Sequence, residues 1–340
     1  MRILYGVQGT GNGHITRARA MLPALQAQGI EVDFLFSGRD AAHYFDMEGF
    51  GTYRIMRGFT FAMEAGCVRP LQTMLAAHPL AFVRDVAKLD TRDYDCVLTD
   101  FEPVSAWAAK RQGVPSVGLA HQYALRYPLP GVPQSPWLRA GITAFAPAQQ
   151  YLGVHWQQFD APILPPLIQI DPSLPTGDDG FVLVYLPFQH AAFLRCWLRA
   201  FAPQRFRIYT QTETAYNDGN IEVRPLSRQA FPQDLARCSG VICNTGFGLC
   251  SEAMAWGKKI LTYPLPKQTE QQSNAKVLQA LRRATVAELF DEDSVRRWLA
   301  EPVAEKMVFP DVAQAVAQWL AAGRSEPVAQ LVARVWQQAG

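Results

Sequence analysis

The feature that most constrains the fold of this chain is a regular alternation of short β-type runs with helical runs, which occurs twice. The β-type runs of the first half are RILYGVQ, EVDFLFSG, YDCVLTD and VPSVGLAH. Those of the second half are FVLVYLPF, RFRIYT, IEVRPL, SGVICNT and KKILTYPL. Strands that alternate with helices form parallel sheets, because each helix carries the chain back to the starting edge. The pattern therefore predicts two α/β domains.

A Pro-rich segment separates the two series of strands. At 340 residues the chain is long enough for two domains. We expect an N-terminal domain over 1–165, a semi-rigid linker over 166–178, a C-terminal domain over 179–324 and a closing helix over 325–340. The two halves share an architecture but no sequence repeat.

Composition narrows the class of protein. Lys and Arg number 32 against 30 for Asp and Glu, and neither half is strongly charged, which disfavours nucleic acid as a partner. No uncharged apolar stretch reaches the roughly 20 residues of a transmembrane helix. The six cysteines lack metal-ligand spacing, and several lie in apolar runs. We therefore expect a cytoplasmic protein with reduced thiols and no bound metal.

The stretch GTGNGH, residues 9 to 14, lies between the first strand and the first helix. Glycines such as Gly11 and Gly13 permit close approach to the backbone, and the N–H groups of a helix start attract negative or polar groups. The spacing is not the dinucleotide pattern GxGxxG, and no acidic residue closes the second strand, which argues against NAD. His14 is either a polar cap or a functional side chain at this edge.

The second half contains a similar edge, where a strand is followed by Asn244, Thr245, Gly246, Phe247 and Gly248 and then by a helix that carries Glu252. After the next strand comes a polar set. Its members are Gln268, Glu270, Gln271, Gln272 and Asn274. The alternative interpretations are a solvated helix charge for Glu252 and a polar surface turn for the glutamines.

These motifs resemble those of the GT-B glycosyltransferases, in particular the UDP-glycosyltransferases and the N-acetylglucosaminyltransferase that forms lipid II. Residues 239–278, GTGNGH and GVPSVGLAHQ carry the likeness. It implies two Rossmann-like, doubly wound parallel-sheet domains that face a cleft. It also implies a UDP-sugar as co-substrate, and no cofactor or metal.

Carried across position by position, the resemblance implies a donor site in the second domain. Gly246 and Gly248 would admit the phosphates, with hydroxyl groups from Thr245 and Ser251, while Glu252 would hold the ribose. The amides would read the hexose hydroxyls, because amides both donate and accept. The full set of donor-binding candidates is Gly11, Gly13, Asn244, Thr245, Gly246, Phe247, Gly248, Ser251, Glu252, Gln268, Gln271, Gln272 and Asn274. Phe231 is either a stacking face for the nucleobase or an ordinary core residue.

The catalytic base is expected in the first domain. His14 at a helix start is the first candidate, because the positive end of the dipole disfavours the imidazolium form. Asp100 would orient His14 or cap the following helix, and Glu102 is a competing base. We expect His121, Gln122 and His190 to line the cleft, with structural roles as the alternative.

The predicted activity is inverting, metal-independent transfer of a hexosyl or N-acetylhexosaminyl group to a hydroxyl acceptor. A lipid-linked sugar, a cell envelope glycan or a small molecule would serve as acceptor. The alternatives are a nucleotide-sugar hydrolase or epimerase, or a non-catalytic nucleotide-sugar binding protein. Residues 125–145 are Pro-rich, aromatic and basic, so they predict either a packed connector or peripheral contact with the inner face of the membrane.

Overall fold

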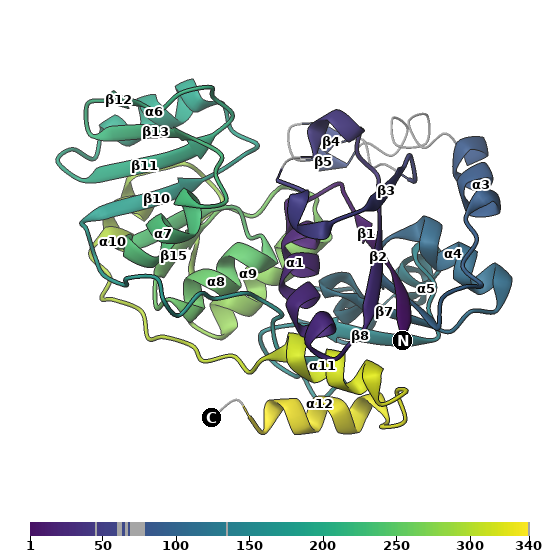
Figure 1. The fold of residues 1–340 in the computed structure, drawn as a ribbon. Coiled ribbons are helices and arrows are strands. Elements are labelled where there is room, and N and C mark those ends of the chain that lie inside the picture. Colours follow the sequence, from purple (N-terminus) through teal and green to yellow (C-terminus); the bar gives the residue numbers. More distant parts are fainter. Residues whose placement is uncertain (45, 60–62, 65–66, 69–78, 134, 339–340) are drawn as a thin grey trace. The chain divides into compact units, whose positions relative to one another are not determined.

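The computed structural model divides the chain into two compact units, shown in Figure 1. It describes all residues except 45, 60–62, 65–66, 69–78, 134 and 339–340. The first unit comprises residues 1–63, 68–169 and 309–340, and the second is built on residues 170–308. Each unit contains a seven-stranded, mostly parallel sheet with helices around it. The α/β prediction with two Rossmann-like domains is therefore confirmed.

The sheet of the first unit has the strand order β3-β2-β1-β6-β7-β8-β9, and all its paired strands are parallel. Its strands are β1 (Arg2–Gln8), β2 (Glu31–Ser37), β3 (Tyr53–Met56), β6 (Cys96–Asp100), β7 (Ser116–Ala120), β8 (Gln150–Val154) and β9 (Ile163–Leu164). The strand order reverses between β1 and β6, where Val7 pairs with Asp100. Ligands of open parallel sheets bind at the carboxyl ends of the strands at such a reversal.

Helices and short 3₁₀ turns connect these strands. They are α1 (Asn12–Ala27), η1 (Ala41–His43), η2 (Glu48–Phe50), α3 (Pro79–Lys88), α4 (Pro103–Gln112), η3 (His121–Arg126) and α5 (Pro136–Phe145). Strand β1 lies very close to α4, because a Cβ built on Gly6 would be 1.9 Å from Oγ of Ser105. Glycine is thus required at the centre of β1, next to the strand-order reversal.

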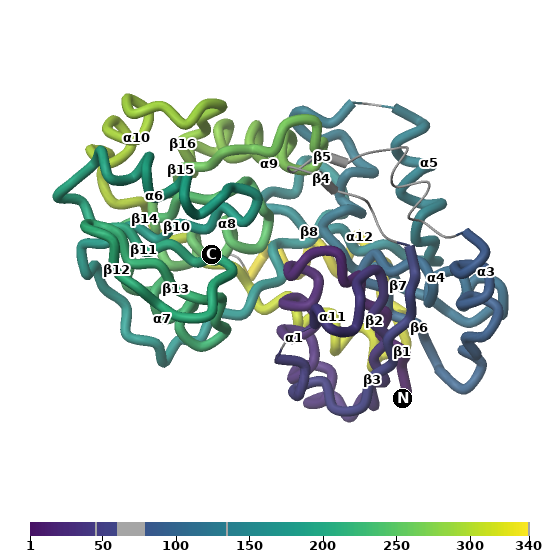
Figure 2. The backbone as a smooth tube through the Cα atoms, turned by 90° about the horizontal axis from the view of Figure 1, so that it is seen from above, coloured from purple at the N-terminus to yellow at the C-terminus, as the bar shows by residue number. Residues whose placement is uncertain are grey.

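The last two helices, α11 (Val312–Ala321) and α12 (Val328–Trp336), belong to the first unit, although they follow the second unit in sequence. Helix α11 lies against α1, as Figures 1 and 2 show, and α12 reaches β9. The apolar stripe of Val312, Val316 and Leu320 is buried. The second unit therefore ends near residue 308 rather than at 324, because α11 buries its apolar face in the first unit.

The sheet of the second unit has the order β12-β13-β11-β10-β14-β15-β16, with β12 antiparallel to its neighbour. Its strands are β10 (Phe181–Tyr185), β11 (Arg205–Thr210), β12 (Tyr216–Asp218), β13 (Ile221–Pro225), β14 (Gly240–Cys243), β15 (Lys259–Thr262) and β16 (Thr285–Val286). Its helices are α6 (Ala191–Arg199), α7 (Ala230–Arg237), α8 (Phe247–Ala255), α9 (Thr269–Ala280) and α10 (Glu292–Leu299). The strand order reverses between β10 and β14, so the polar segment that begins at Asn244 leaves the sheet at the reversal.

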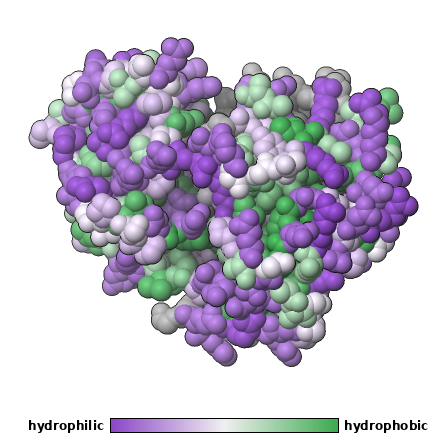
Figure 3. Space-filling model, viewed as in Figure 1, coloured by the Kyte–Doolittle hydropathy of each residue, from purple (hydrophilic) through white to green (hydrophobic). Residues whose placement is uncertain are grey.

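Polar side chains predominate on the face of the molecule that Figure 3 draws. Figure 3 shows hydrophilic side chains over most of the face in view, with apolar ones in smaller patches. Across the described ranges, no helix is both long enough and apolar enough to cross a bilayer. Residues 125–145 end in α5, where Ile142 is buried while Trp137 is exposed.

Candidate functional site

His14 lies in the first turn of α1, directly after the glycine-rich turn. The helix begins at Asn12, and its N-cap residue, Gly11, has no side chain that could cap it. Nothing lies within 4 Å of a Cβ built on Gly13, so this side of the helix start is open. His14 is 9% exposed, so its side chain is largely buried. The turn therefore presents an imidazole and an uncapped helix start at the carboxyl end of β1.

His14 contacts Asp100, the last residue of β6, across the strand-order reversal. Nδ1 of His14 lies 2.6 Å from Oδ1 of Asp100, although the two residues are 86 positions apart. Asp100 is fully buried. Burial alone would raise the pKa of Asp100, but the charge of Arg17 and the contact with His14 outweigh it and hold this pKa below its usual value. A buried aspartate that remains ionised can orient the imidazole and stabilise its protonated form.

Arg17 completes this cluster, and our sequence analysis missed it. Its Nε donates to Oδ2 of Asp100 at 2.6 Å, and one Nη donates to Oδ1 at 2.5 Å. The same Nη lies 3.1 Å from Nδ1 of His14. The sequence did contain a signal for Arg17, namely its spacing from His14. Residues three positions apart on a helix lie on the same face. An arginine three residues after the candidate histidine was therefore a detectable neighbour.

Glu102, the competing base, is the N-cap of α4. Its carboxylate accepts hydrogen bonds from the N–H groups of Val104 at 2.8 Å and Ser105 at 2.7 Å. Oγ of Ser37 donates to it at 2.5 Å. The side chain is fully buried, and burial raises the pKa of Glu102, although the hydrogen bonds that it accepts act in the opposite direction. This geometry gives Glu102 a structural role as the cap of α4.

Three further residues were expected near a cleft. His121 is buried, and its Nδ1 lies 2.9 Å from the carbonyl oxygen of Val154. Gln122 follows it in η3 and is half-buried. His190 is exposed at the start of α6, after the carboxyl end of β10. Of the three, His190 has a side chain that is open to solvent at a sheet edge.

In the second unit, helix α8 starts at the strand-order reversal without a side-chain cap. Gly246 is its N-cap, and neither Gly246 nor Gly248 has any atom within 4 Å of a built Cβ. Phe247, the first residue of the helix, is buried. Asn244 donates from Nδ2 to the carbonyl oxygen of Tyr263 at 2.8 Å, and its Oδ1 has no hydrogen-bond partner among the described residues. An open, uncapped helix start suits a phosphate group.

Glu252 lies one turn further along α8. It is half-buried, and its carboxylate has no hydrogen-bond or ion-pair partner in the described part of the chain. Burial without a nearby cation raises the pKa of Glu252 to about 7. A carboxylate with unfilled acceptor positions close to an uncapped helix start is typical of a ligand-binding residue rather than of a solvated helix charge.

The amides after β15 divide into two groups. Gln271 accepts at Oε1 from the N–H of Leu265, and Gln272 donates from Nε2 to the carbonyl oxygen of the same residue, so both hold the loop before α9. Gln268 is the N-cap residue of α9, and its Oε1 has no partner among the described residues. Gln268 therefore has an unfilled side-chain acceptor, and this atom is buried.

Three predicted donor contacts are buried within the second unit. Asn274 donates to the carbonyl oxygen of Thr245 at 3.1 Å, and the hydroxyl of Thr245 is 3.0 Å from that of Thr262. Ser251 donates to the carbonyl oxygen of Phe247 at 2.7 Å. Thr245, Ser251 and Asn274 are fully buried. Their side chains are bonded within the unit around the start of α8 and do not offer a free surface to a phosphate or a sugar.

Phe231 lies on α7 beside the carboxyl ends of β10 and β11. Its ring packs against Tyr185 and Tyr209, with centroid distances of 5.6 and 5.0 Å. The hydroxyl of Tyr209 donates to Asp234, which also accepts from Arg207 and Arg224. Phe231 is half-buried, so one part of the ring packs and another stays accessible. Both interpretations made from sequence, packing and stacking, are compatible with this position.

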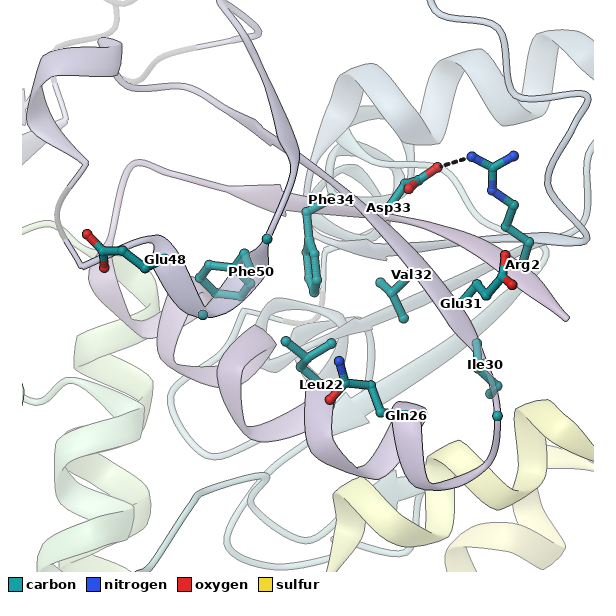
Figure 4. A pocket seen from close by; sticks show the side chains of 13 residues that line it. Arg2, Leu22, Gln26, Ile30, Glu31, Val32, Asp33, Phe34, Glu48 and Phe50 are labelled. Atoms are coloured by element: carbon teal, nitrogen blue, oxygen red, sulfur yellow. Dashed lines mark hydrogen bonds and ion pairs between the residues drawn. The ribbon is translucent and has the colours of Figure 1, made fainter.

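A groove of about 680 Å³ lies elsewhere in the first unit (Figure 4). It is bounded by Leu22 and Gln26 of α1, by Phe34 of β2 and by Glu48 and Phe50 of η2. It extends to Arg2 and Glu31, where β1 and β2 begin, and so lies away from the carboxyl-end site of His14.

Among the residues that the structure describes, no group of three or more His, Cys, Asp or Glu side chains is arranged to hold a metal ion.

Comparisons with known proteins identify the family and the fold of the chain. The model of glycosyl transferase family 1 matches residues 1–136 and 151–301. No curated protein matches the sequence. Among solved structures, the glycosyltransferase SnogD from Streptomyces nogalater is 16% identical, with a TM-score of 0.56 and coverage of 98% of this chain and 96% of that chain.

Two other similar structures belong to glycosyltransferases. UGT89C1 from Arabidopsis thaliana, complexed with quercetin, has a TM-score of 0.60 at 13% identity and covers 99% of this chain and 94% of its own. SsfS6 from Streptomyces sp. SF2575, complexed with thymidine diphosphate, has a TM-score of 0.58 at 15% identity and covers 99% of each chain. These likenesses establish the two-domain GT-B architecture. Together with the family match over most of its length, they show that the chain is a glycosyltransferase and belongs to glycosyl transferase family 1.

Proposed function

We propose that the protein transfers a sugar from a UDP-sugar to a hydroxyl acceptor, with inversion, and that His14 is the general base. The observation that carries this proposal is the contact between His14 and the buried, ionised Asp100 at the strand-order reversal. With Nδ1 directed at Asp100, the imidazole can use Nε2 to accept a proton. A positioned base of this kind supports attack by a weakly acidic alcohol.

The reaction is a single displacement at the anomeric carbon. The acceptor oxygen gives its proton to Nε2 of His14 and bonds to that carbon while the bond from the carbon to the diphosphate oxygen breaks. The nucleoside diphosphate leaves with the bonding electron pair. One displacement without a covalent glycosyl intermediate inverts the configuration of the anomeric carbon.

The second unit supplies the proposed donor site. The open start of α8 at Gly246 and Gly248 binds the diphosphate, and Glu252 accepts hydrogen bonds from the ribose hydroxyls. Gln268 contacts the hexose, and Phe231 contacts the base. Support for a nucleotide comes from similar structures: LpCGTa and UGT89C1 are complexed with UDP and SsfS6 with thymidine diphosphate.

The diphosphate carries its negative charge to the helix start as it leaves. Backbone N–H groups and the positive end of the α8 dipole neutralise part of this charge without reorganisation. We therefore propose that transfer needs no divalent metal ion. The base requires only an acceptor hydroxyl from which it can take a proton. A lipid-linked sugar, a glycan or a small molecule with an accessible hydroxyl would therefore serve as acceptor.

The direct test is His14→Ala, assayed with a panel of UDP-sugars and acceptors. Turnover should fall by about 10²–10⁴-fold, the usual contribution of a positioned general base. Donor binding, followed by thermal shift, should change little because the donor contacts lie in the second unit. His43→Ala is the matched control, since His43 is an exposed histidine of the same unit. NMR of the product should show inversion.

Three results would oppose the proposal. Near-parent turnover in His14→Ala would remove the base assignment. Retention of the anomeric configuration would require a second displacement. Loss of the sugar from the donor at the same rate with and without acceptor would identify a hydrolase, while donor binding without turnover would identify a binding protein.

A further inference from the structure

We propose that Arg17 is a positioning residue that holds Asp100 and so sets the orientation, the tautomer and the charge environment of His14. The inference rests on the proposed role of His14 as the base. It concerns a residue that does not contact either substrate in this account. Its effect passes through the carboxylate that both side chains touch.

The geometry is that of a two-point clamp. Nε of Arg17 donates to Oδ2 of Asp100 at 2.6 Å, and an Nη donates to Oδ1 at 2.5 Å. Arg17 is 8% exposed and Asp100 is not exposed, so water screens this ion pair poorly. Two parallel hydrogen bonds fix the carboxylate in both position and plane. Asp100 therefore presents Oδ1 to His14 in one orientation.

The same clamp decides which nitrogen of His14 carries the proton. A carboxylate oxygen can only accept, so the 2.6 Å approach of Nδ1 to Oδ1 of Asp100 requires a proton on Nδ1. The neighbouring Nη of Arg17, 3.1 Å from Nδ1, is itself a donor and already binds Oδ1. The lone pair of the neutral ring thus lies on Nε2, where a base needs it.

Charge is the second consequence of the clamp. With Arg17 present, Asp100 and Arg17 cancel, and a proton on His14 leaves the cluster with a net positive charge. Without the arginine charge, Asp100 alone would face the imidazole, and protonation would make the cluster neutral. Removal of the arginine charge is therefore expected to favour the imidazolium form in the variant, because a nearby like charge disfavours it.

Two phenols also interact electrostatically with Asp100, those of Tyr5 on β1 and Tyr123 on η3. Burial raises the pKa of Tyr5 and of Tyr123 well above the usual value for a phenol. Both therefore stay neutral wherever histidine titrates. Their charge state does not compete with the effect of Arg17.

The test compares Arg17→Gln, which removes the charge but keeps an N–H donor, with Arg17→Lys, which keeps the charge but loses the fork. The full-length proteins are assayed for kcat/KM from about pH 5 to 9, the range in which histidine controls activity. In Arg17→Gln the acid limb should move to higher pH by roughly one to two units. In Arg17→Lys it should stay close to that of the parent.

Proton NMR of the His14 ring, recorded without substrate, gives a second readout. The midpoint of the His14 titration should move upward in Arg17→Gln and not in Arg17→Lys. An unmoved midpoint and acid limb in both variants, with only a lower plateau, would show a purely structural role and overturn the inference. A moved midpoint in a protein that transfers no sugar would instead reject the proposed function and leave the coupling intact.

Discussion

Glu252 offers a quantitative test of the donor site, because its protonation state should control nucleotide-sugar affinity. A carboxylate can accept hydrogen bonds from both vicinal ribose hydroxyls, whereas the protonated acid loses acceptor capacity. The pKa of Glu252 is about 7 in the free protein. Ligand binding should therefore favour the ionised form and release a proton at neutral pH.

The magnitude follows from this pKa. At pH 6 roughly one tenth of the free protein is ionised at Glu252, so the affinity should be about tenfold weaker than at pH 8. In Glu252→Gln the pH dependence should disappear. The affinity at pH 8 should also fall by about 10- to 100-fold, because hydrogen bonds to charged groups contribute about 1.5–3 kcal/mol.

Isothermal titration calorimetry with a UDP-sugar from about pH 6 to 8.5 measures both effects. A UDP-sugar is a better ligand for this measurement than UDP. The terminal phosphate of UDP ionises at about pH 6 and would add its own pH dependence, whereas a UDP-sugar lacks this group. Glu288→Gln is the control, since Glu288 is an exposed carboxylate of the same unit. A dissociation constant that does not change with pH, or parent-like affinity in Glu252→Gln, would refute the ribose assignment.

Two further predictions concern the leaving group and the fold. Activity should survive EDTA, because backbone N–H groups at the start of α8 hold the diphosphate; complete loss that Mg²⁺ or Mn²⁺ restores would contradict this. Gly6→Ala should lower the free energy of unfolding by about 1–3 kcal/mol in urea denaturation, because its Cβ would be 1.9 Å from Oγ of Ser105. Gly13→Ala, which has no atom within 4 Å of its Cβ, is the matched control and should not destabilise; equal losses in both variants would argue against the packing explanation.

The sequence alone determined the strand–helix alternation and the two glycine-containing strand ends. These features are local, because a strand, a turn and a helix start need only neighbouring residues to specify them. The candidates His14 and Glu252 followed from their places after such strands. For this reason His14 remains the proposed base in the first unit, and Glu252 remains a proposed donor contact in the second.

Only the tertiary structure decided what surrounds these residues. It joined His14 and Arg17 to Asp100 across the sheet, and it made Glu102 a helix cap. It also buried Ser251 and Asn274 inside the second unit, where they donate to the backbone carbonyl oxygens of Phe247 and Thr245.

The return of α11 to the first unit was likewise invisible in the sequence. Its apolar stripe of Val312, Val316 and Leu320 predicted a buried helix face and was correct in that respect. An apolar stripe shows that a helix packs against another surface, but it does not show which one. The hydrophobic effect is non-directional, so many apolar surfaces could cover the same stripe. Strand order and side-chain partners over long separations are fixed by the packing of the whole chain, which is why they had to come from the structure.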